Sequence, residues 1–476
     1  MLSPATRSET AGVAGIELND VHSRLNATRV GSVIRPAGVA GAIEAVRTAA
    51  RAGEPLAVMG ARHAMGGQQF LSGGRVLDLG ALDRVTAFDD SRGLVTVEAG
   101  IRWPALLAWL AWHPANTRGW TIRQKQTGAD DFSLGGALAS NIHGRGLAFA
   151  PFVDDVESLT LIGPGGNLVH ADRRENPGLF ALVAGGYGLF GAVVGITLRL
   201  VQRTTLLREV RMTRATGLMA DFDAAIAAGC TYGDFQFTVD AGSDDFLDLG
   251  ILSCYRPVDG GPDAAPRRSL DARDFSRLLA LAHVDPGRAF SEYAAFYLAT
   301  DGQRYASDEQ QAGVYPGDYH APIDACLGHA GSEMITELYV PRSRLAGFLG
   351  AAADALRRTR AQVVYGTVRL VERDVDSVLA WAREPWACVV FNLHVRHDAA
   401  GLASAAKSFR ALIDLALARG GSYYLTYHRW ATREQVEAAH PRFVEFLRAK
   451  REFDPAGRWS SDWHRHHCRL FETVPA

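Results

Sequence analysis

The spacing of apolar residues predicts one helix between short strands near the start of the chain. Apolar residues recur at helical spacing over residues 39–50, and compact apolar runs at 56–59 and 76–79 are typical of buried strands. Further along, apolar and polar residues alternate around Val95, the period of a strand with one buried face. A helix expected at 103–112 closes this unit.

Beyond residue 205 the pattern changes to longer strands separated by irregular stretches of unequal length. Helical spacing recurs at 345–356 and 409–416, and no regular strand-helix-strand rhythm develops. This pattern favours an antiparallel sheet that helices cover. A stretch rich in Pro, Gly, Asp and Ala at 256–330 predicts a long excursion with short helices. The expected strands are 206–211, 232–239, 248–254, 334–340, 363–371 and 387–396.

The C-terminal stretch predicts a strand at 420–428 and then a helix that begins after Thr432. Gln435 stands three residues after Thr432, which is the spacing of a capping box. Together these patterns predict an α+β protein. Its expected parts are residues 1–205, residues 206–415 with the antiparallel sheet, and residues 416–476, which return to the first part.

Three glycine-rich stretches interrupt the first part of the chain. The first, at 60–69, directly follows the strand expected at 56–59, and the others lie at 132–146 and 185–191. Glycine lacks the Cβ that blocks close approach, so such a turn brings backbone N–H groups near an anion such as a pyrophosphate. One glycine-rich loop is weak evidence, and the order and spacing of the three are more specific.

In that order and spacing, the three stretches resemble the FAD-binding domain of the vanillyl-alcohol oxidase and p-cresol methylhydroxylase (PCMH) superfamily. The resemblance implies a PCMH-type FAD-binding domain of two subdomains at 1–205 and a substrate-binding cap at 206–415. The first loop would surround the pyrophosphate, the second would lie beside the isoalloxazine ring, and the third near the adenosine half. The segment at 420–467 resembles the sugar and polyol branch, which includes alditol oxidase, aldonolactone oxidoreductases and decaprenylphosphoryl-ribose oxidase.

His63 lies inside the first loop, where many members of the superfamily attach FAD covalently through an imidazole nitrogen. The resemblance therefore implies FAD bonded to His63, and a histidine that only hydrogen-bonds within the loop is the alternative. The implied cofactor-binding residues are Gly60, Ala61, Arg62, His63, Ala64, Gly67, Gln68, Ser133, Gly136, Asn141, His143, Gly144, Gly191 and Val193.

Four further residues are expected to face the flavin and the substrate. Arg369 matches an arginine near the flavin in alditol-oxidase-like enzymes, and its strand is otherwise apolar, so an inward charge there needs a partner. His143 would contact the flavin or the substrate, although a core histidine is the alternative. Asn392 and His394 share one face of a strand, which suits a pocket that recognises hydroxyl groups or hydrogen bonds within the domain.

The catalytic base is expected on the C-terminal strand. Relatives often have a lysine there, whereas this chain has Tyr427 and His428. Histidine has the more suitable pKa near neutrality, and a tyrosine would need its pKa lowered by a neighbour such as Arg369. Both residues stay candidates, with Arg369 and His143 completing the expected catalytic set.

Composition excludes several classes of partner. A formal net charge of -2 and a pI near 6.7 give no electrostatic footprint for nucleic acid or an anionic membrane. No apolar run approaches the length of a membrane-spanning helix. The resemblance implies a small-molecule substrate and an electron acceptor, oxygen or another, as partners, while the oligomeric state is left open.

The cysteines and the C-terminal histidines predict neither disulfides nor a metal site. The five cysteines are far apart and odd in number, which favours buried reduced thiols in a cytoplasmic protein. His464, His466 and His467 match no common zinc spacing, so a solvated terminus is expected there.

Three functions are compatible with these observations. The first is an FAD-dependent oxidoreductase that oxidises a CH–OH group of a sugar, polyol or glycosylated small molecule by hydride transfer to flavin N5. The second uses the flavin on an amine, a phenol or a biosynthetic intermediate of specialised metabolism. The third is a flavin-binding fold without turnover. No second nucleotide motif indicates a reductase fed by NAD(P)H.

Overall fold

A small sheet with a parallel core begins the fold. The structure is a computed structural model that describes residues 7–9, 15–128, 130–264, 267–313 and 319–471. The elements of this first sheet are β1 (Arg7–Glu9), β4 (Ser32–Arg35), α1 (Val39–Ala52), β5 (Leu56–Met59) and β6 (Arg75–Asp78). Strands β4, β6 and β5 pair in parallel, and β1 adds an antiparallel edge. Helix α1 is the crossover from β4 to β5, two parallel strands that lie on either side of β6.

A five-stranded antiparallel sheet packs next to it, in the order β11-β10-β12-β8-β7. Its strands are β7 (Val85–Asp89), β8 (Leu94–Glu98), β10 (Val156–Ile162), β11 (Leu168–Asp172) and β12 (Ala192–Arg199). The helices beside it are α2 (Trp103–Trp112), α3 (Leu134–Ser140) and α4 (Pro177–Val183). The expected strand at 56–59 and helix at 103–112 are confirmed.

Several short elements connect these sheets. They are β2 (Ile16–Leu18), β3 (Thr28–Val30), β9 (Trp120–Thr121), the 3-10 turn η1 (Phe152–Asp155) and β13 (Val201–Gln202). Strands β2 and β3 form one antiparallel pair, and β9 and β13 form another.

The middle of the chain forms an eight-stranded antiparallel sheet, here called the cap sheet. Its order is β17-β14-β16-β15-β19-β20-β18-β21. The strands are β14 (Thr205–Arg214), β15 (Tyr232–Phe237), β16 (Leu249–Val258), β17 (Arg304–Ala306), β18 (Gly331–Pro341), β19 (Val363–Val371), β20 (Trp386–Arg396) and β21 (Ser422–Tyr423). The six strands expected from the sequence are all present, within a few residues at each end.

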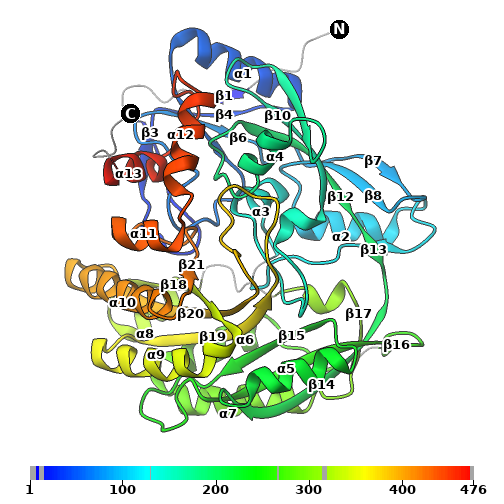
Figure 1. The fold of residues 1–476 in the computed structure, drawn as a ribbon, viewed down its shortest axis with the longest axis vertical. Helices are drawn as coiled ribbons and strands as arrows, with labels where there is room; N and C mark the ends of the chain where they lie inside the picture. The colour runs from blue at the N-terminus through cyan, green and yellow to red at the C-terminus, as the bar shows by residue number, and fades with distance from the viewer. Residues whose placement is uncertain (1–6, 10–14, 129, 265–266, 314–318, 472–476) are drawn as a thin grey trace.

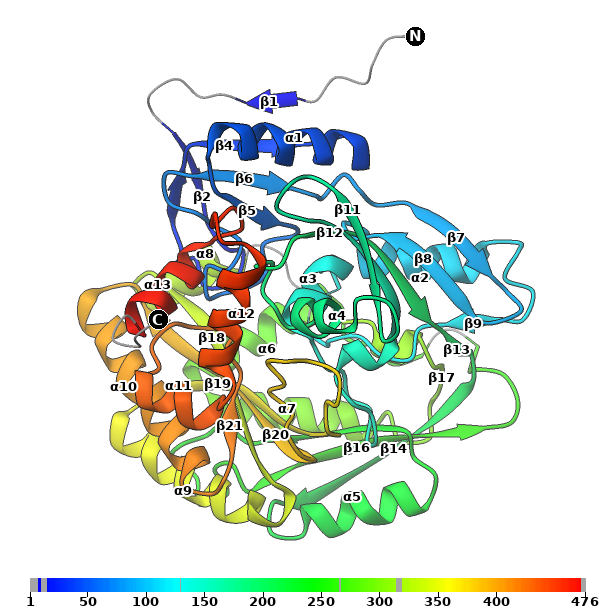
Figure 2. The ribbon, with the colours of Figure 1, turned by 45° about the horizontal axis from the view of Figure 1, so that its top comes forward.

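Helices cover the cap sheet, as Figures 1 and 2 show. They are α5 (Leu218–Ala227), α6 (Ala272–Val284), α7 (Pro286–Leu298), α8 (His320–Leu327), α9 (Leu345–Thr359) and α10 (Ala399–Leu417), with 3-10 turns η2 (Glu309–Gln311) and η3 (Arg342–Arg344). Helices α6, α7 and α8 belong to the expected excursion at 256–330.

The two faces of the cap sheet differ in chemistry. Leu338 of β18 and Phe391 of β20 belong to a core cluster with Phe348 of α9 and Phe409 of α10. The residues that alternate with these core residues face the first part of the chain. They include Glu337 and several other polar residues. Because successive side chains point to opposite faces, each strand supplies both an apolar core face and a polar face.

The C-terminal segment crosses from the cap sheet to the first sheet (Figures 1 and 2). Its helices are α11 (Arg433–Ala439), α12 (Phe443–Phe453) and α13 (Asp462–Leu470). The capping box of Thr432 and Gln435 is confirmed at α11. The backbone N–H of Leu56 donates to the carbonyl of Arg458 at 2.6 Å, which fixes the return to the first sheet.

Two expectations for this segment are wrong. The strand expected at 420–428 is limited to β21, because Gln68 of the first glycine-rich loop donates its side-chain N–H to the carbonyl of Thr426 at 2.9 Å and the chain turns away from the sheet. The C-terminal histidines do not form a solvated terminus, since they lie on α13 and His467 is buried against Trp463 and Phe443.

The mixed α+β class is confirmed by these sheets and helices.

Cys326 is exposed, which corrects the expectation that all thiols are buried, whereas Cys230, Cys254 and Cys388 are buried. Within the described ranges, no helix combines the length and the apolar character needed to cross a bilayer. The expected domain boundaries at 205/206 and 415/416 stay predictions.

Candidate active site

A cavity of about 1040 Å³ lies between the three glycine-rich stretches and the polar face of the cap sheet. The expected site residues that line it are Gly60, Ala61, Arg62, His63, Ala64, Gln68, Ser133, Gly136, His143, Gly191, Val193, Arg369, Asn392 and Tyr427. The expected site residues that do not line it are Gly67, Asn141, Gly144, His394 and His428. The cavity therefore unites segments that are far apart in the sequence.

The first glycine-rich loop presents unpaired backbone donors to this cavity. Among the described residues, none of the backbone N–H groups of residues 61–64 donates to an acceptor, although these residues line the cavity. Arg62 has φ +63°, so the turn is left-handed there. A Cβ on Gly60 would lie 2.4 Å from Ser133 Oγ, so any larger residue there would displace the Ser133 side chain. Free N–H groups in a tight turn are the donors that a pyrophosphate requires.

The third glycine-rich stretch also requires glycine at the cavity wall. Gly191 has φ +127°, and a Cβ there would lie 2.7 Å from the carbonyl oxygen of Ile162. The backbone can therefore pass directly against β10 and leave the cavity open. These features fit a dinucleotide cofactor of the size of FAD.

His63 is held rigidly at the cavity wall by two contacts. Its ring stacks on Phe132 at 4.0 Å between centroids, and its Nε2 lies 2.9 Å from the carbonyl oxygen of Asp131. Since a carbonyl oxygen only accepts, Nε2 carries the proton and Nδ1, 2.7 Å from His22 Nε2, carries the lone pair. Burial lowers the pKa of His63 to about 4, so the ring is neutral near pH 7.

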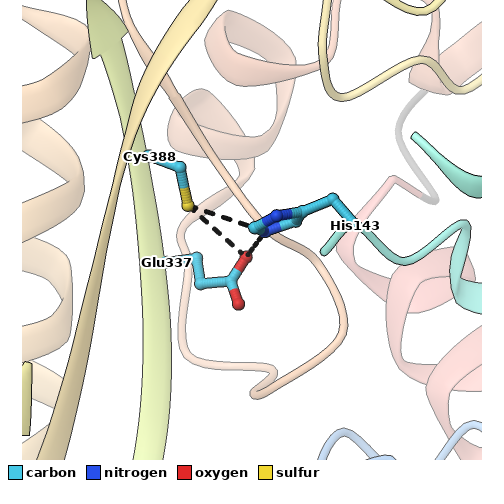
Figure 3. Close-up of side chains that lie close together, drawn as sticks. All are labelled: His143, Glu337 and Cys388. Carbon is cyan, nitrogen blue, oxygen red and sulfur yellow. Dashed lines mark hydrogen bonds and ion pairs between the residues drawn. The ribbon is translucent and has the colours of Figure 1, made fainter. Parts of the chain in front are cut away.

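A buried polar cluster stands where the cap sheet meets the second glycine-rich stretch (Figure 3). Glu337 of β18 accepts from Tyr427 at 2.7 Å through Oε1 and from Tyr339 at 2.9 Å through Oε2. His143 Nε2 lies 3.0 Å from Glu337 Oε2, and Cys388 Sγ of β20 lies 3.6 Å from that nitrogen. We call these residues the Glu337 cluster.

Hydrogen-bond contacts indicate where protons lie in the Glu337 cluster. His143 Nδ1 lies 2.9 Å from the carbonyl oxygen of Gly144, so Nδ1 carries a proton. The contact between His143 Nε2 and Glu337 Oε2 then needs a second proton, which the two residues share. Burial of Glu337 opposes ionisation, but His143, the Tyr427 hydroxyl and Arg369 outweigh it and lower the pKa of this carboxyl to about 2.

Arg369 of β19 brings a positive charge to the same part of the cavity. It is 8% exposed, and its Nη2 donates to Thr127 Oγ1. Its Nε has no acceptor among the described residues. A buried guanidinium with an unused donor is costly unless a ligand accepts from it. Its position in the cavity supports the expected contact with an anionic flavin or substrate oxygen.

The two candidate bases on the C-terminal segment have different surroundings. Tyr427 lines the cavity and donates to Glu337, while burial and that negative charge raise the pKa of Tyr427 well above its usual value. His428 points into a ring cluster with Phe409 and Trp430 instead. Burial lowers the pKa of His428 to about 3. Of the two side chains, only Tyr427 faces the cavity.

Asn392 and His394 also have different surroundings, although they share one face of β20. Asn392 lines the cavity, and its Oδ1 is buried without a hydrogen-bond partner among the described residues. His394 contacts Glu333 of β18 and His329 instead. Burial opposes ionisation of Glu333, but the contacts with His283 and His394 outweigh it and lower its pKa to about 2.

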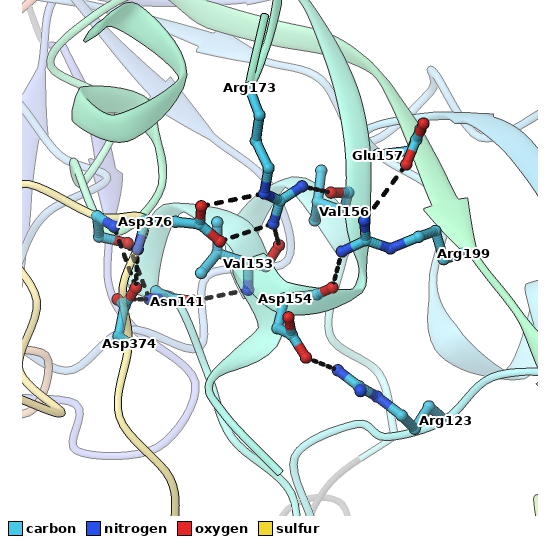
Figure 4. Close-up of polar contacts among 11 residues, drawn as sticks. Arg123, Asn141, Val153, Asp154, Val156, Glu157, Arg173, Arg199, Asp374 and Asp376 are labelled. Carbon is cyan, nitrogen blue, oxygen red and sulfur yellow. Dashed lines mark hydrogen bonds and ion pairs between the residues drawn. The ribbon is translucent and has the colours of Figure 1, made fainter. Parts of the chain in front are cut away.

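A cap loop that contains Asp374 and Asp376 docks against the second glycine-rich stretch (Figure 4). Asn141 Nδ2 donates to Asp374 Oδ2 at 2.9 Å, and its Oδ1 accepts from the backbone of Val153. Arg173 forms a two-pronged ion pair with Asp376 at 3.0 and 2.7 Å. Asn141 therefore supports the site through this loop without lining the cavity.

The sequence analysis missed the acidic residues of the site. Glu333 and Glu337 belong to β18, in the region expected to be a strand, and they alternate with the core residues Met334 and Leu338. Two carboxylates on one face of an otherwise buried strand are the signal that could have identified them. Cys388 gave no such signal, because a buried cysteine is an ordinary core residue.

The far part of the cavity is aromatic. Side chains of α7 and its neighbours, namely Phe290, Tyr293, Phe296, Tyr297 and Tyr365, line it. Arg208 stacks over the Tyr297 ring at 4.4 Å. The cavity thus combines a polar region at the Glu337 cluster with an aromatic region beneath α7.

Comparisons with known proteins agree with this arrangement. Residues 31–172 match the family described as FAD binding domain. An uncharacterized oxidoreductase, ORF5 in the fasciation locus of Rhodococcoides fascians, is 32% identical over 180 residues, which are 38% of this chain and 40% of the relative. The mitochondrial L-galactono-1,4-lactone dehydrogenase 1 of Oryza sativa subsp. japonica is 30% identical over 146 residues, 30% of this chain and 24% of the relative.

A third relative matches almost the whole chain. The decaprenylphosphoryl-beta-D-ribose oxidase of Mycolicibacterium smegmatis (strain ATCC 700084 / mc(2)155) is 24% identical over 440 residues, which are 88% of this chain and 90% of the relative. The first two relatives, in contrast, are matched over less than half of their own length.

The match identifies residues 31–172, which include the first two glycine-rich stretches, as an FAD binding domain. The chain is also similar to relatives named as a lactone dehydrogenase and a ribose oxidase. The resemblance inferred from the sequence is thereby confirmed.

Proposed function

We propose that the protein is an FAD-dependent oxidoreductase that oxidises a CH–OH group of a sugar, a polyol or a glycosylated small molecule. The observation that carries this proposal is the single cavity, in which the FAD-binding loops face the Glu337 cluster, Arg369 and Asn392. Bound FAD supplies the acceptor for the two electrons and the hydrogen that leave the substrate carbon. Names of relatives that include a lactone and a ribose support a sugar-like substrate.

The residues of the first loop would hold the pyrophosphate of FAD through the free N–H groups at 61–64. We further propose that His63 bonds covalently to FAD through Nδ1. Support comes from the neutral ring, the lone pair assigned to Nδ1 and the ring orientation fixed by Phe132 and Asp131. Acid precipitation tests this, because covalently held flavin stays with the protein.

Within the cavity, Tyr427 and Glu337 would remove the hydroxyl proton of the substrate. A substrate hydroxyl donates to the Tyr427 oxygen while Tyr427 passes its own proton to Glu337 Oε1, 2.7 Å away. This relay never leaves a free tyrosinate, so the raised pKa of Tyr427 does not prevent it. Arg369, with its unused Nε, would stabilise negative charge on the substrate oxygen or on the flavin.

The aromatic region favours a second candidate function. Phe290, Tyr293 and Phe296 suit a large apolar group better than a simple polyol. A glycosylated molecule with an apolar part satisfies both regions of the cavity. An amine, a phenol or a biosynthetic intermediate would use the aromatic region alone.

The electron acceptor is proposed to be oxygen or another oxidant. A cytoplasmic location also stays a proposal, which rests on the odd number and wide spacing of the cysteines.

An anaerobic screen of alcohols, sugars, glycosides, amines and phenols tests the proposal by following flavin bleaching. Bleaching by compounds with a CH–OH group, and not by amines or phenols, is the expected result. Bleaching only by amines or phenols would favour the second function. A protein that binds FAD and is bleached by none of these classes would agree with a flavin-binding fold without turnover.

A further inference from the structure

A second buried histidine and carboxylate cluster stands on the cap sheet, apart from the Glu337 cluster. Glu333 of β18 lies directly opposite His394 of β20 in the strand register, and His283 from the last turn of α6 reaches the same carboxylate. The side chain of Glu333 is 2% exposed, that of His394 5% and that of His283 1%. We call His283, Glu333 and His394 the α6 triad.

We propose that the α6 triad binds a divalent transition-metal ion, Zn²⁺ by ligand type. His283 Nε2 lies 3.0 Å and His394 Nδ1 3.1 Å from Glu333 Oε1, and the three ligand atoms all lie within 4.8 Å of one another. Ligand atoms about 2.0–2.1 Å from a tetrahedral zinc ion lie roughly 3.3 Å apart. To enclose the ion, the two contacts with Glu333 Oε1 therefore need only a small expansion, and the two imidazole nitrogens lie within 4.8 Å of each other.

The hydrogen bonds of His329 place a lone pair on Nδ1 of a neutral His394, and this lone pair faces the carboxylate of Glu333. His329 Nδ1 lies 3.1 Å from the carbonyl oxygen of Leu327, which only accepts, so His329 carries its proton there. His329 Nε2 then accepts from His394 Nε2, 2.9 Å away. A neutral His394 is left with a lone pair on Nδ1 opposite Glu333 Oε1, and the two repel unless a positive charge lies between them.

The contacts of His283 favour a metal ion over a proton as that charge. A proton on His394 Nδ1 would form a hydrogen bond with Glu333 Oε1 only, and would leave His283 without a partner. His283 Nε2 lies near the same carboxylate oxygen without hydrogen-bond geometry, and within the described part of the chain neither of its ring nitrogens, nor Glu333 Oε2, has a hydrogen-bond partner. A metal ion accepts lone pairs from all three residues at once.

The surroundings supply the other parts of a metal site. His329 holds the outer nitrogen of His394, the kind of second contact that fixes a ligating imidazole. Glu333 lines the large cavity, so the fourth position is open to water or to a substrate oxygen. Leu279 and Ala282 of α6 also line that cavity. An ion in the triad would fix this wall to the cap sheet.

The test uses tag-free flavoprotein that has been stripped with a chelator and then given Zn²⁺ or Co²⁺. We expect one Zn²⁺ per chain by elemental analysis after gel filtration, and Co²⁺ bands at longer wavelengths than the flavin absorption. His283→Gln, Glu333→Gln and His394→Gln should each weaken binding by about 100-fold or more, and His329→Gln by about 10- to 100-fold. FAD content and circular dichroism confirm that each variant folds.

His440→Gln is the matched control. His440 is also buried, with both ring nitrogens unpartnered among the described residues, but it belongs to no potential metal-binding group there. It should bind zinc like the unmodified protein. Absence of binding by the unmodified protein, or equal binding by all variants, would overturn the proposal. An ion that leaves only in Cys388→Ser would belong to the Glu337 cluster, and that result would overturn it as well.

Discussion

The proposed proton relay can be tested by two substitutions. Each removes a tyrosine hydroxyl that donates a hydrogen bond to Glu337. Tyr427 and Tyr339 each donate one hydroxyl to Glu337, at 2.7 and 2.9 Å. Tyr427 lines the cavity, whereas Tyr339 does not line it and is fully buried. Tyr427→Phe and Tyr339→Phe are therefore matched in the bond that they remove and differ in access to substrate.

The structure sets the size of each effect. A hydrogen bond to a charged group contributes about 1.5–3 kcal/mol, so the loss of either hydroxyl would raise the pKa of Glu337, which is about 2 in the unmodified protein, by a few units at most. Glu337 thus stays ionised at pH 7 in both variants. The two variants should lose similar stability. Only Tyr427→Phe removes the group that receives the substrate proton, which should slow flavin reduction by about 100- to 10,000-fold.

The assay is anaerobic stopped-flow reduction of the flavin by a substrate that bleaches the unmodified protein. Thermal unfolding of each variant and its FAD content are measured beside it. We expect Tyr339→Phe to slow reduction by less than about 10-fold. Equal rates in the two variants, at equal FAD content, would mean that the hydroxyls act only by holding Glu337 in place, and the relay through Tyr427 would be refuted.

Four further predictions concern the cofactor, the charges and the domain contact. Arg369→Ala should slow flavin reduction about 100-fold while FAD stays bound, as measured by stopped flow and absorbance. Acid-precipitated unmodified protein should stay yellow and His63→Ala should release its flavin, and release from both would show that the flavin is held without a covalent bond. His428 has a folded pKa of about 3 against 6.5 when unfolded, so the unfolded state binds more protons and stability falls as pH drops below 6.5. His428→Phe should abolish about 2 kcal/mol of that loss at pH 5 in denaturant titrations and leave flavin reduction intact. Arg173→Ala, which leaves Asp376 unpaired, should lower unfolding stability by about 2 kcal/mol in the same titrations, and an unchanged midpoint would contradict the docking role of that loop.

The strands of the cap sheet could be predicted from sequence, because one face of each packs against helices. Phe391 and Leu338 belong to such faces, and their spacing gives a clear period. The opposite face is also buried, beneath the FAD-binding loops, so it shows little of the polar alternation of a solvent-exposed sheet face. Glu337 and Cys388 are hidden in that face and could be identified only once the strand register was known.

The C-terminal segment shows a different limit of sequence reasoning. The run that includes Tyr427 and His428 is typical of a strand, and a strand would have directed these neighbours to opposite faces. The chain leaves the sheet after Tyr423, because Gln68 bonds the carbonyl of Thr426. The partner in that bond lies more than three hundred residues away in sequence, so no local pattern could have predicted the turn.

The low pKa of Glu337 determines what this carboxylate can do. A carboxylate with a pKa of about 2 is a weak base, and alone it would draw little proton density from a hydroxyl group. In the proposed relay, Tyr427 changes this, because its hydroxyl already donates to Oε1 and its proton would move only when a second proton arrives behind it. His143 Nε2, 3.0 Å from Oε2, holds the other oxygen of this carboxylate in place. The contacts that weaken Glu337 as a free base are thus the ones that orient it to receive a proton through Tyr427.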